Sequence, residues 1–212
     1  METRRRAVRE DGRRRREAIL VKAVELAAVD GLEGLSIGNL AAALQMSKSG
    51  VYAHFGSKEE LQLATVARAS QAFSTEVVEP ALARPAGLAR VVAFCDAYLE
   101  RLRGRDLPGG CFFAAATLEE GPRRGPVKHV VARHQREVWS LVHGFLTEAR
   151  AGGELPDSED LDELMLELQG VLLAANARYV VEGEDAVLGL AAKIVRRRLG
   201  VPGGPGGTSP EV

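Results

Sequence analysis

The sequence predicts an all-α fold of about nine helices, and three observations carry this prediction. Of the 212 residues, 46% are apolar but only 5% are aromatic, and alanine and leucine, both strong helix formers, are abundant. Apolar residues recur at spacings of three and four, and no long stretch alternates apolar and polar residues as a half-buried strand does. Prolines and paired glycines gather between these periodic segments, where they end helices.

Residues 1–12 are expected to form a flexible basic arm, because they contain few apolar residues and four arginines: Arg4, Arg5, Arg6 and Arg9. Such an arm suits contact with DNA phosphates or the minor groove, and it suits a solvated tail equally well. The first helix is expected to begin near Asp11 or Arg13. It should end at Gly31, since glycine is favoured just after a last helical turn.

Two short helices are predicted between Ser36 and Phe55, joined by a tight connection at Gln45 and Met46. Ser36 and Ser47 are each placed to cap one of them, because a serine oxygen can accept from the free N–H groups of a first turn. Helices this short are not stable alone in water, so they must pack on each other and on a neighbour. The pattern is typical of a helix-turn-helix. A glycine in place of Gln45 would tolerate a positive φ more easily.

This stretch resembles the N-terminal DNA-binding domain of TetR-family transcriptional regulators. The resemblance rests on Ser36, on Ala41, and on the two runs Ser47-Lys48-Ser49-Gly50-Val51-Tyr52-Ala53-His54-Phe55 and Lys58-Glu59-Glu60-Leu61. Leu40 stands for the usual isoleucine of the family, and Gln45-Met46 for the usual Gly-Val. The match is strong from residue 13 to about residue 65, and the rest of the chain agrees with the family in length and helical pattern.

The resemblance implies a DNA-binding head at residues 13–60 and a helical ligand-binding and dimerisation body at residues 61–200. The second short helix carries polar or cationic side chains on or beside its open face, and such side chains can bind phosphates and the edges of bases. The DNA-binding candidates, with supporting neighbours, are Ser36, Ser47, Lys48, Ser49, Gly50, Tyr52, His54 and Lys58.

The body is expected to consist of further helices. Ser57 and Glu60 form a capping box, which opens a helix to about Val78 that Pro80 and Pro85 stop. The remaining helices are expected at residues 86–104, 109–120, 126–151, 159–181 (capped by Asp157 or Ser158) and 185–199. Residues 201–212 are rich in glycine and proline and are expected to be a disordered tail.

Charge is divided unevenly although the formal net charge is −1. Residues 1–58 hold eleven lysines and arginines against seven acids, and residues 59–212 hold seventeen against twenty-two. A basic head on an acidic body suits one face meeting DNA. Cys95 and Cys111 suggest no disulfide framework, which fits a cytoplasmic protein, and a redox role for either stays open. No secretory signal is recognised, and the apolar stretch near residues 170–175 is too short to span a membrane.

No catalytic set is found, so the sequence predicts a protein that is not an enzyme and needs no cofactor or metal. His129, His134 and His143 fall on one predicted helix, but their spacings do not form the i, i+4 pair that helical metal sites use. A phosphate-binding glycine loop and a G-x-S-x-G nucleophile elbow are both missing from the sequence.

The resemblance also implies a small-molecule effector and a homodimer. Pocket candidates, each of which also suits ordinary core packing, are Tyr98, Phe112, Phe113, Trp139, Asn176 and Arg178. The last two helices would pair with their copies, because the first of them is apolar on more than one side and needs two partners. The interface candidates are Leu161, Leu164, Leu168, Leu172, Ala175, Tyr179, Leu188, Ala191, Ile194 and Val195.

The function expected is a dimeric repressor that a small ligand releases from a pseudo-palindromic operator. An activator, or a regulator without a small ligand, fits the same residues. A helical enzyme and a sequence-independent nucleoid protein are more remote alternatives. The amino-acid sequence does not identify the operator, the effector or the controlled genes.

Overall fold

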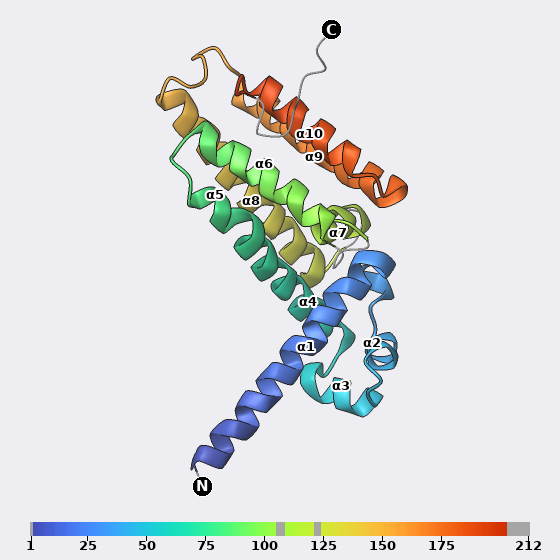
Figure 1. Cartoon of the computed structure of the whole chain (residues 1–212). Coiled ribbons are helices and arrows are strands. Elements are labelled where there is room, and N and C mark those ends of the chain that lie inside the picture. The colour runs from blue at the N-terminus through green and yellow to red at the C-terminus, as the bar shows by residue number, and fades with distance from the viewer. Residues whose placement is uncertain (1, 105–108, 121–123, 203–212) are drawn as a thin grey trace. The chain divides into compact units, whose positions relative to one another are not determined.

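The computed structural model describes residues 2–104, 109–120 and 124–202. All regular secondary structure in those ranges is helical, and they contain no strand (Figure 1). The all-α prediction is therefore confirmed. The chain divides into two compact units. Unit 1 comprises Met1–Ala72 with Asp106–Gln135, and unit 2 comprises Phe73–Arg105 with Arg136–Val212. The expected tail lies outside the described residues from residue 203 onward.

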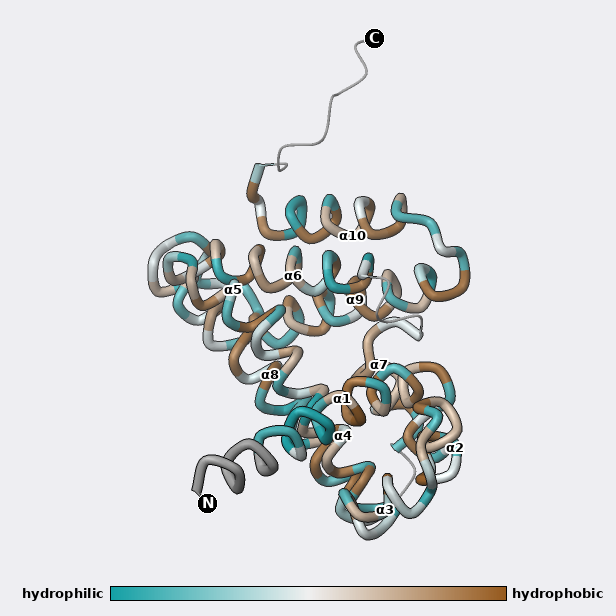
Figure 2. The backbone as a smooth tube through the Cα atoms, turned by 60° about the horizontal axis from the view of Figure 1, so that its bottom comes forward, coloured by the Kyte–Doolittle hydropathy of each residue, from teal (hydrophilic) through white to brown (hydrophobic). Residues whose placement is uncertain are grey.

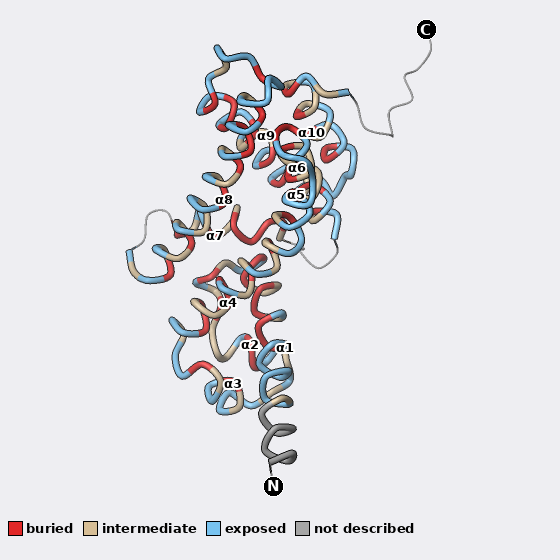
Figure 3. The backbone as a smooth tube through the Cα atoms, turned by 90° about the vertical axis from the view of Figure 1, so that its left-hand side faces the viewer, coloured by how far each residue is buried: buried red, intermediate tan, exposed pale blue. Residues whose placement is uncertain are grey.

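Helix α1 spans Glu2–Gly34 and is interrupted at Gly31, whose φ of 77° and ψ of 165° are not helical. The expected end is confirmed, but the expected start near Asp11 or Arg13 is wrong, and the basic segment from residue 2 is helical rather than an arm. Arginine and glutamate favour helix, and the ion pair of Arg13 with Glu10, 2.8 Å long, links successive turns. Figure 3 shows α1 exposed in its first described turns and buried along one side farther on.

Helices α2 (Ile37–Ala43) and α3 (Lys48–Phe55) form the expected helix-turn-helix. The Ser36 hydroxyl accepts from the N–H of Asn39, and the Ser47 hydroxyl accepts from the N–H of Gly50, each at 3.1 Å. Both predicted caps are thus confirmed. The apolar sides of these helices meet α1 and α4 in one small core, whose most buried members are Ile19, Leu32, Leu35, Leu40, Val51 and Leu61.

Helix α4 (Lys58–Phe73) continues through a π-helical turn, η1 (Ser74–Val78), into α5 (Glu79–Leu82). The expectation that Pro80 stops this helix is wrong. In the π-turn the N–H of Glu79 reaches back five residues to the Ser74 carbonyl, so Pro80 falls in the first turn of α5, where its missing N–H costs little. The helix stops before Pro85 instead.

Unit 2 contains η1, α5, α6 (Leu88–Arg103), the last part of α8 (Pro126–Ala151), α9 (Leu161–Glu182) and α10 (Asp185–Arg198). Helix α7 (Phe112–Glu120) belongs to unit 1. The N-cap of α9 is Asp160, which accepts from the N–H groups of Asp162 and Glu163, rather than Asp157 or Ser158. Gly183, with φ 68°, ends α9 as expected. In Figure 2 the hydrophobic side of α10 faces α9 and its hydrophilic side points away.

Candidate nucleic-acid interface

Helix α3 presents a polar face with a buried back. Lys48, Ser49 and Tyr52 are exposed, and the Tyr52 ring keeps 57% of its surface accessible. Of the neighbouring residues of α3, Val51 is fully buried and Phe55 is 7% exposed. The small core therefore fixes the helix while the lysine ammonium and the tyrosine hydroxyl point outward, where they can donate hydrogen bonds to an acceptor-rich partner.

The other DNA-binding candidates divide by what they already bond. Ser36 and Ser47 act first as caps, and the Ser47 hydroxyl also lies 3.2 Å from that of Ser49. Gly50 donates its N–H to the Ser47 cap and is half-buried. His54 is half-buried at the end of α3. The structure thus brings Lys48, Ser49 and Tyr52 together as the accessible group.

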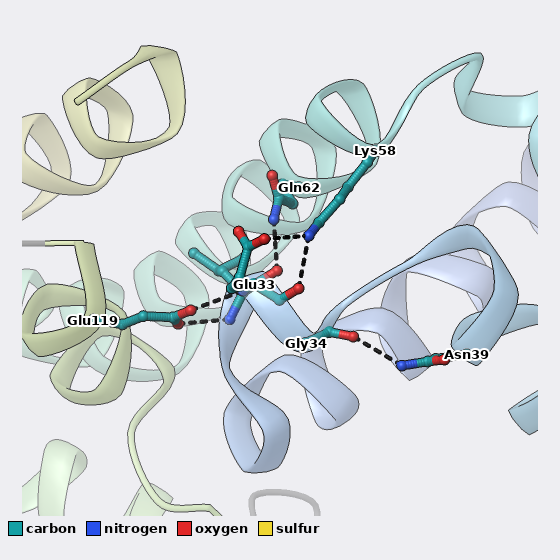
Figure 4. A network of polar contacts seen from close by, with 7 residues as sticks. Glu33, Gly34, Asn39, Lys58, Gln62 and Glu119 are labelled. Carbon is teal, nitrogen blue, oxygen red and sulfur yellow. Dashed lines mark hydrogen bonds and ion pairs between the residues drawn. The ribbon is translucent and has the colours of Figure 1, made fainter. Parts of the chain in front are cut away.

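Lys58 differs from the expectation of a freely available cation at the start of α4. Its Nζ donates to the Glu33 carbonyl oxygen at 2.8 Å and lies 2.7 Å from the Glu33 carboxylate (Figure 4). The side chain is still 40% exposed, so one donor remains for an outside acceptor. Nothing in the sequence pointed to Glu33, which lies 25 residues away and enters only through folding.

The basic N-terminal part of α1 adds cations that were not among the DNA-binding candidates expected from the sequence. The Arg16 guanidinium lies over the Phe55 ring, 5.1 Å from its centroid, at the C-terminal end of α3. Arg13, Arg14 and Arg15 are exposed on the preceding turn. A cation beside the last turn of α3 also interacts favourably with the helix dipole. The positive surface therefore extends from α3 onto α1.

The expected aromatic pocket residues are divided between the two units, and within each unit they pack against other rings. In unit 1, Phe112 packs edge-on against Phe113 with centroids 5.1 Å apart, and Phe113 stacks on His134. In unit 2, Phe73 lies edge-on to Tyr98 and to Phe94, whose ring in turn meets Trp139 edge-on at 6.1 Å.

The two polar pocket candidates lie on different sides of α9. Asn176 is buried in unit 2, 8% exposed. Arg178 is exposed and pairs with Glu182 through hydrogen bonds of 3.0 and 2.9 Å, and it lines the groove between α9 and α10. Two residues along a helix point about 200° apart, which the apolar pattern alone did not resolve.

Most of the expected interface residues are buried within the single chain. Those below 6% exposure are Leu161, Leu164, Leu168, Leu172, Ala175, Leu188, Ala191 and Val195, while Tyr179 and Ile194 are half-buried. These residues pack α9 and α10 on each other and on α6, and the groove between α9 and α10 is also lined by five of them, Leu168, Ala175, Ala191, Ile194 and Val195. The sequence recognised apolar groups on more than one side of α9, and the structure covers one of these sides with α6 and α10.

The outer side of α9 and α10 carries the exposed apolar residues instead. A groove of about 730 Å³ runs between the two helices, and its floor includes Gly170, Val171, Ala174, Leu190 and Ile194. Leu190 is 48% exposed, and Leu166, Leu173 and Val181 on α9 are 46% to 84% exposed. Helix α9 is also long and apolar enough to cross a membrane by length and composition, contrary to the sequence-based expectation, but a helix packed on both α6 and α10 meets the same criteria.

The two cysteines are buried in different units, and the described residues contain no cluster of three metal-ligating side chains. Burial, with a smaller contribution from the neighbouring Asp96, raises the pKa of the Cys95 thiol to about 12. The thiolate that oxidants and metals require is therefore disfavoured at Cys95.

Comparisons with known proteins agree with this architecture. Residues 19–65 match the family model described as bacterial regulatory proteins, tetR family, and residues 87–195 match the tetracyclin repressor-like C-terminal domain. No curated protein sequence matches the chain.

Solved structures share the fold at low identity. A TetR transcriptional regulator from Chloroflexus aurantiacus J-10-FL is 22% identical, with a TM-score of 0.81 over 90% of this chain and 96% of that one. AibR, solved with isovaleryl coenzyme A and operator DNA, is 21% identical, with a TM-score of 0.70 over 86% and 97%. A CifR cysteine mutant, complexed with 26 bp double-strand operator DNA, is 22% identical, with a TM-score of 0.71 over 86% and 94%.

Proposed function

Because this chain belongs to the TetR family and is a DNA-binding transcriptional regulator, we propose that it acts as a homodimeric repressor released from a pseudo-palindromic operator by a small molecule. The observation that carries the DNA-binding part is the face of α3, where Lys48, Ser49 and Tyr52 are exposed over a buried Val51. A helix held from behind by a small core can enter a major groove without rearranging.

Lys48 and Tyr52 would make the principal contacts with phosphates or base edges. The Lys48 ammonium lies beside Gly38 of α2, where only a hydrogen stands in place of a side chain. Ser49 would add a hydroxyl, and the caps Ser36 and Ser47 would present their helix starts to the backbone. Lys58 would bind a phosphate with the donor that Glu33 leaves unused.

Two copies of this face are needed for a palindrome, with recognition helices about 34–36 Å apart. The groove between α9 and α10 supports a dimer, because its exposed apolar floor loses water when a second copy of the same two helices covers it. The charged residues Glu167, Arg178, Arg197 and Arg198 border this floor and would form the polar rim.

Release by a ligand requires that the ligand bind two conformations unequally. The α4–η1–α5 helix starts beside the α3 face and continues into unit 2, so a ligand that favours another position of this helix would change the spacing of the two recognition helices. AibR was solved with both an acyl coenzyme A and operator DNA, which supports a ligand for a protein of this fold. An activator is the second candidate and would use the same DNA-binding face.

The test uses fluorescence anisotropy with duplexes from the DNA upstream of the chain's own gene, at fixed salt. The paired substitution Lys48→Ala and Tyr52→Ala should weaken binding to the selected duplex by at least about tenfold, since each base contact contributes on the order of 1–3 kcal/mol. Lys22→Ala, on α1 and paired with Glu25, is the matched control and should bind normally. Unchanged binding by the double variant would remove α3 as the reading face. Equal binding of selected and random DNA by the wild type would favour a sequence-independent nucleoid protein.

A further inference from the structure

The short turn that follows Gly31 in α1 is held by side chains from three other helices. On its donor side, the Leu32 and Glu33 N–H groups bond the two carboxylate oxygens of Glu119 in α7, at 2.7 and 2.8 Å (Figure 4). On its acceptor side, the carbonyls of residues 32, 33 and 34 accept from Gln62 and Lys58 of α4 and from Asn39 of α2. These hydrogen bonds connect the turn to α2, α4 and α7.

Helix α7 and the segment just before it approach the last turns of α1 at two points that glycine occupies. A Cβ on Gly31 would lie 2.7 Å from a Glu119 oxygen, and the φ of 77° at Gly31 already disfavours any other residue. A Cβ on Gly109, just before α7, would lie 1.8 Å from the Ala28 carbonyl oxygen of α1. Both ends of α7 are therefore in close contact with the last turns of α1.

Glu33 is the residue that α7 and α4 share. Glu119 binds its N–H, and Lys58 binds both its carbonyl and its carboxylate. The ammonium of Lys58 is thus partly neutralised by an exposed carboxylate. A DNA phosphate that approaches Lys58 must compete with Glu33, and it is also repelled by the Glu33 charge.

We propose that Glu119 is a positioning residue for DNA binding: by fixing Glu33, it sets how strongly Lys58 binds the DNA backbone, so that α7 controls a phosphate contact of α4. This inference rests on the proposed function only in taking Lys58 to contact DNA. A shift of α7 that withdraws Glu119 frees the turn, loosens the hold of Glu33 on Lys58 and strengthens the phosphate contact. Helix α7 thereby adjusts affinity without touching the face of α3 that reads sequence.

The test is a set of double-mutant cycles read as binding constants over a salt series. Glu33→Gln should tighten DNA binding about twofold to fivefold, the range expected for one exposed ion pair. It should also make the slope of log K against the logarithm of the salt concentration steeper, by about the amount that corresponds to one further phosphate contact. Glu119→Gln keeps one acceptor oxygen and should act in the same direction. Its effect should disappear in a Lys58→Ala background and in a Glu33→Gln background. Asp30→Asn removes the same charge just before this turn, where none of the described groups bonds the carboxylate, and it should leave the binding constant unchanged.

The proposal would be overturned if the effects of Glu119→Gln and Lys58→Ala on the DNA-binding constant were additive. It would also be overturned if Asp30→Asn changed the binding constant as much as Glu33→Gln does. Circular dichroism checks folding, and Glu119→Asp, which keeps the charge on a shorter side chain, replaces Glu119→Gln in the cycle if the latter unfolds. The same cycles on random duplex separate the two hypotheses, because a phosphate contact carries no sequence information. Coupling without operator preference would reject only the proposed function, and operator preference without coupling would reject only this inference.

Discussion

The imidazole of His134 in α8 lies almost parallel to the ring of Phe113 in α7, with 17° between the planes and 3.5 Å between the centroids. The Nδ1 of His134 is 3.1 Å from the Ser70 hydroxyl of α4. Burial lowers the pKa of His134 from 6.5 to about 4, because the charged imidazolium would lose its hydration. The neutral ring therefore joins three helices of unit 1.

This contact predicts a dependence of stability on pH. The pKa of His134 is lower in the folded state than in the unfolded state, so its contribution to stability is complete above about pH 6.5 and is lost as the pH falls toward 4. Thermal unfolding of the wild type should lose stability over this range more steeply than that of His134→Gln. His129→Gln, an exposed position on the same helix, should keep the wild-type slope. Parallel slopes for wild type and His134→Gln would contradict the assignment.

The turn of the helix-turn-helix stores strain at Gln45. Its φ of 54° is the one positive value among the described residues other than glycine. A left-handed conformation costs a residue with a Cβ about 1–2 kcal/mol. Gln45→Gly should therefore stabilise the protein, by about 0.5–1 kcal/mol after the greater freedom of glycine in the unfolded chain is subtracted. Chemical denaturation measures the gain, and Gln45→Ala, which keeps the Cβ, should show none of it.

The close approach of α7 to α1 predicts opposite outcomes for two glycine-to-alanine changes. Gly109→Ala places a Cβ against the Ala28 carbonyl and should destabilise the protein by about 1–3 kcal/mol, as overpacking does. Gly144→Ala, inside α8 with open space around it, should stabilise by about 0.5–1 kcal/mol because alanine favours helix. Differential scanning calorimetry distinguishes them. A neutral Gly109→Ala would mean that the loop moves aside without cost.

The outer groove of α9 and α10 predicts how to separate the proposed dimer. Leu190→Glu adds a charge at a half-exposed position of the groove and should give a folded monomer in sedimentation velocity. Leu118→Glu, on α7 and 73% exposed, is the control and should remain dimeric. Leu168 is unsuitable for this experiment because it is 1% exposed, so a charge there disrupts the core. A dimer that persists in Leu190→Glu would place the interface elsewhere.

The sequence by itself determined the features that depend on residues within about one helical turn of each other. The caps Ser36 and Ser47, the glycine ends at Gly31 and Gly183, and the paired short helices all follow from such local hydrogen bonding and spacing. The family motif added the DNA-binding candidates Lys48 and Tyr52, which are four residues apart and therefore share one side of a helix, next to the buried Val51.

Only the tertiary structure decided which apolar residues face inward and which distant charges meet. Leu168 and Leu173 are the same residue type on one helix, yet 1% and 46% of their surfaces are exposed, because α6 and α10 cover one side of α9. Glu33 pairs with Lys58, and Glu119 accepts a hydrogen bond from Leu32, although the partners are far apart in the sequence. Periodicity identifies an apolar side but not the element that covers it, and long-range ion pairs depend on how whole helices pack.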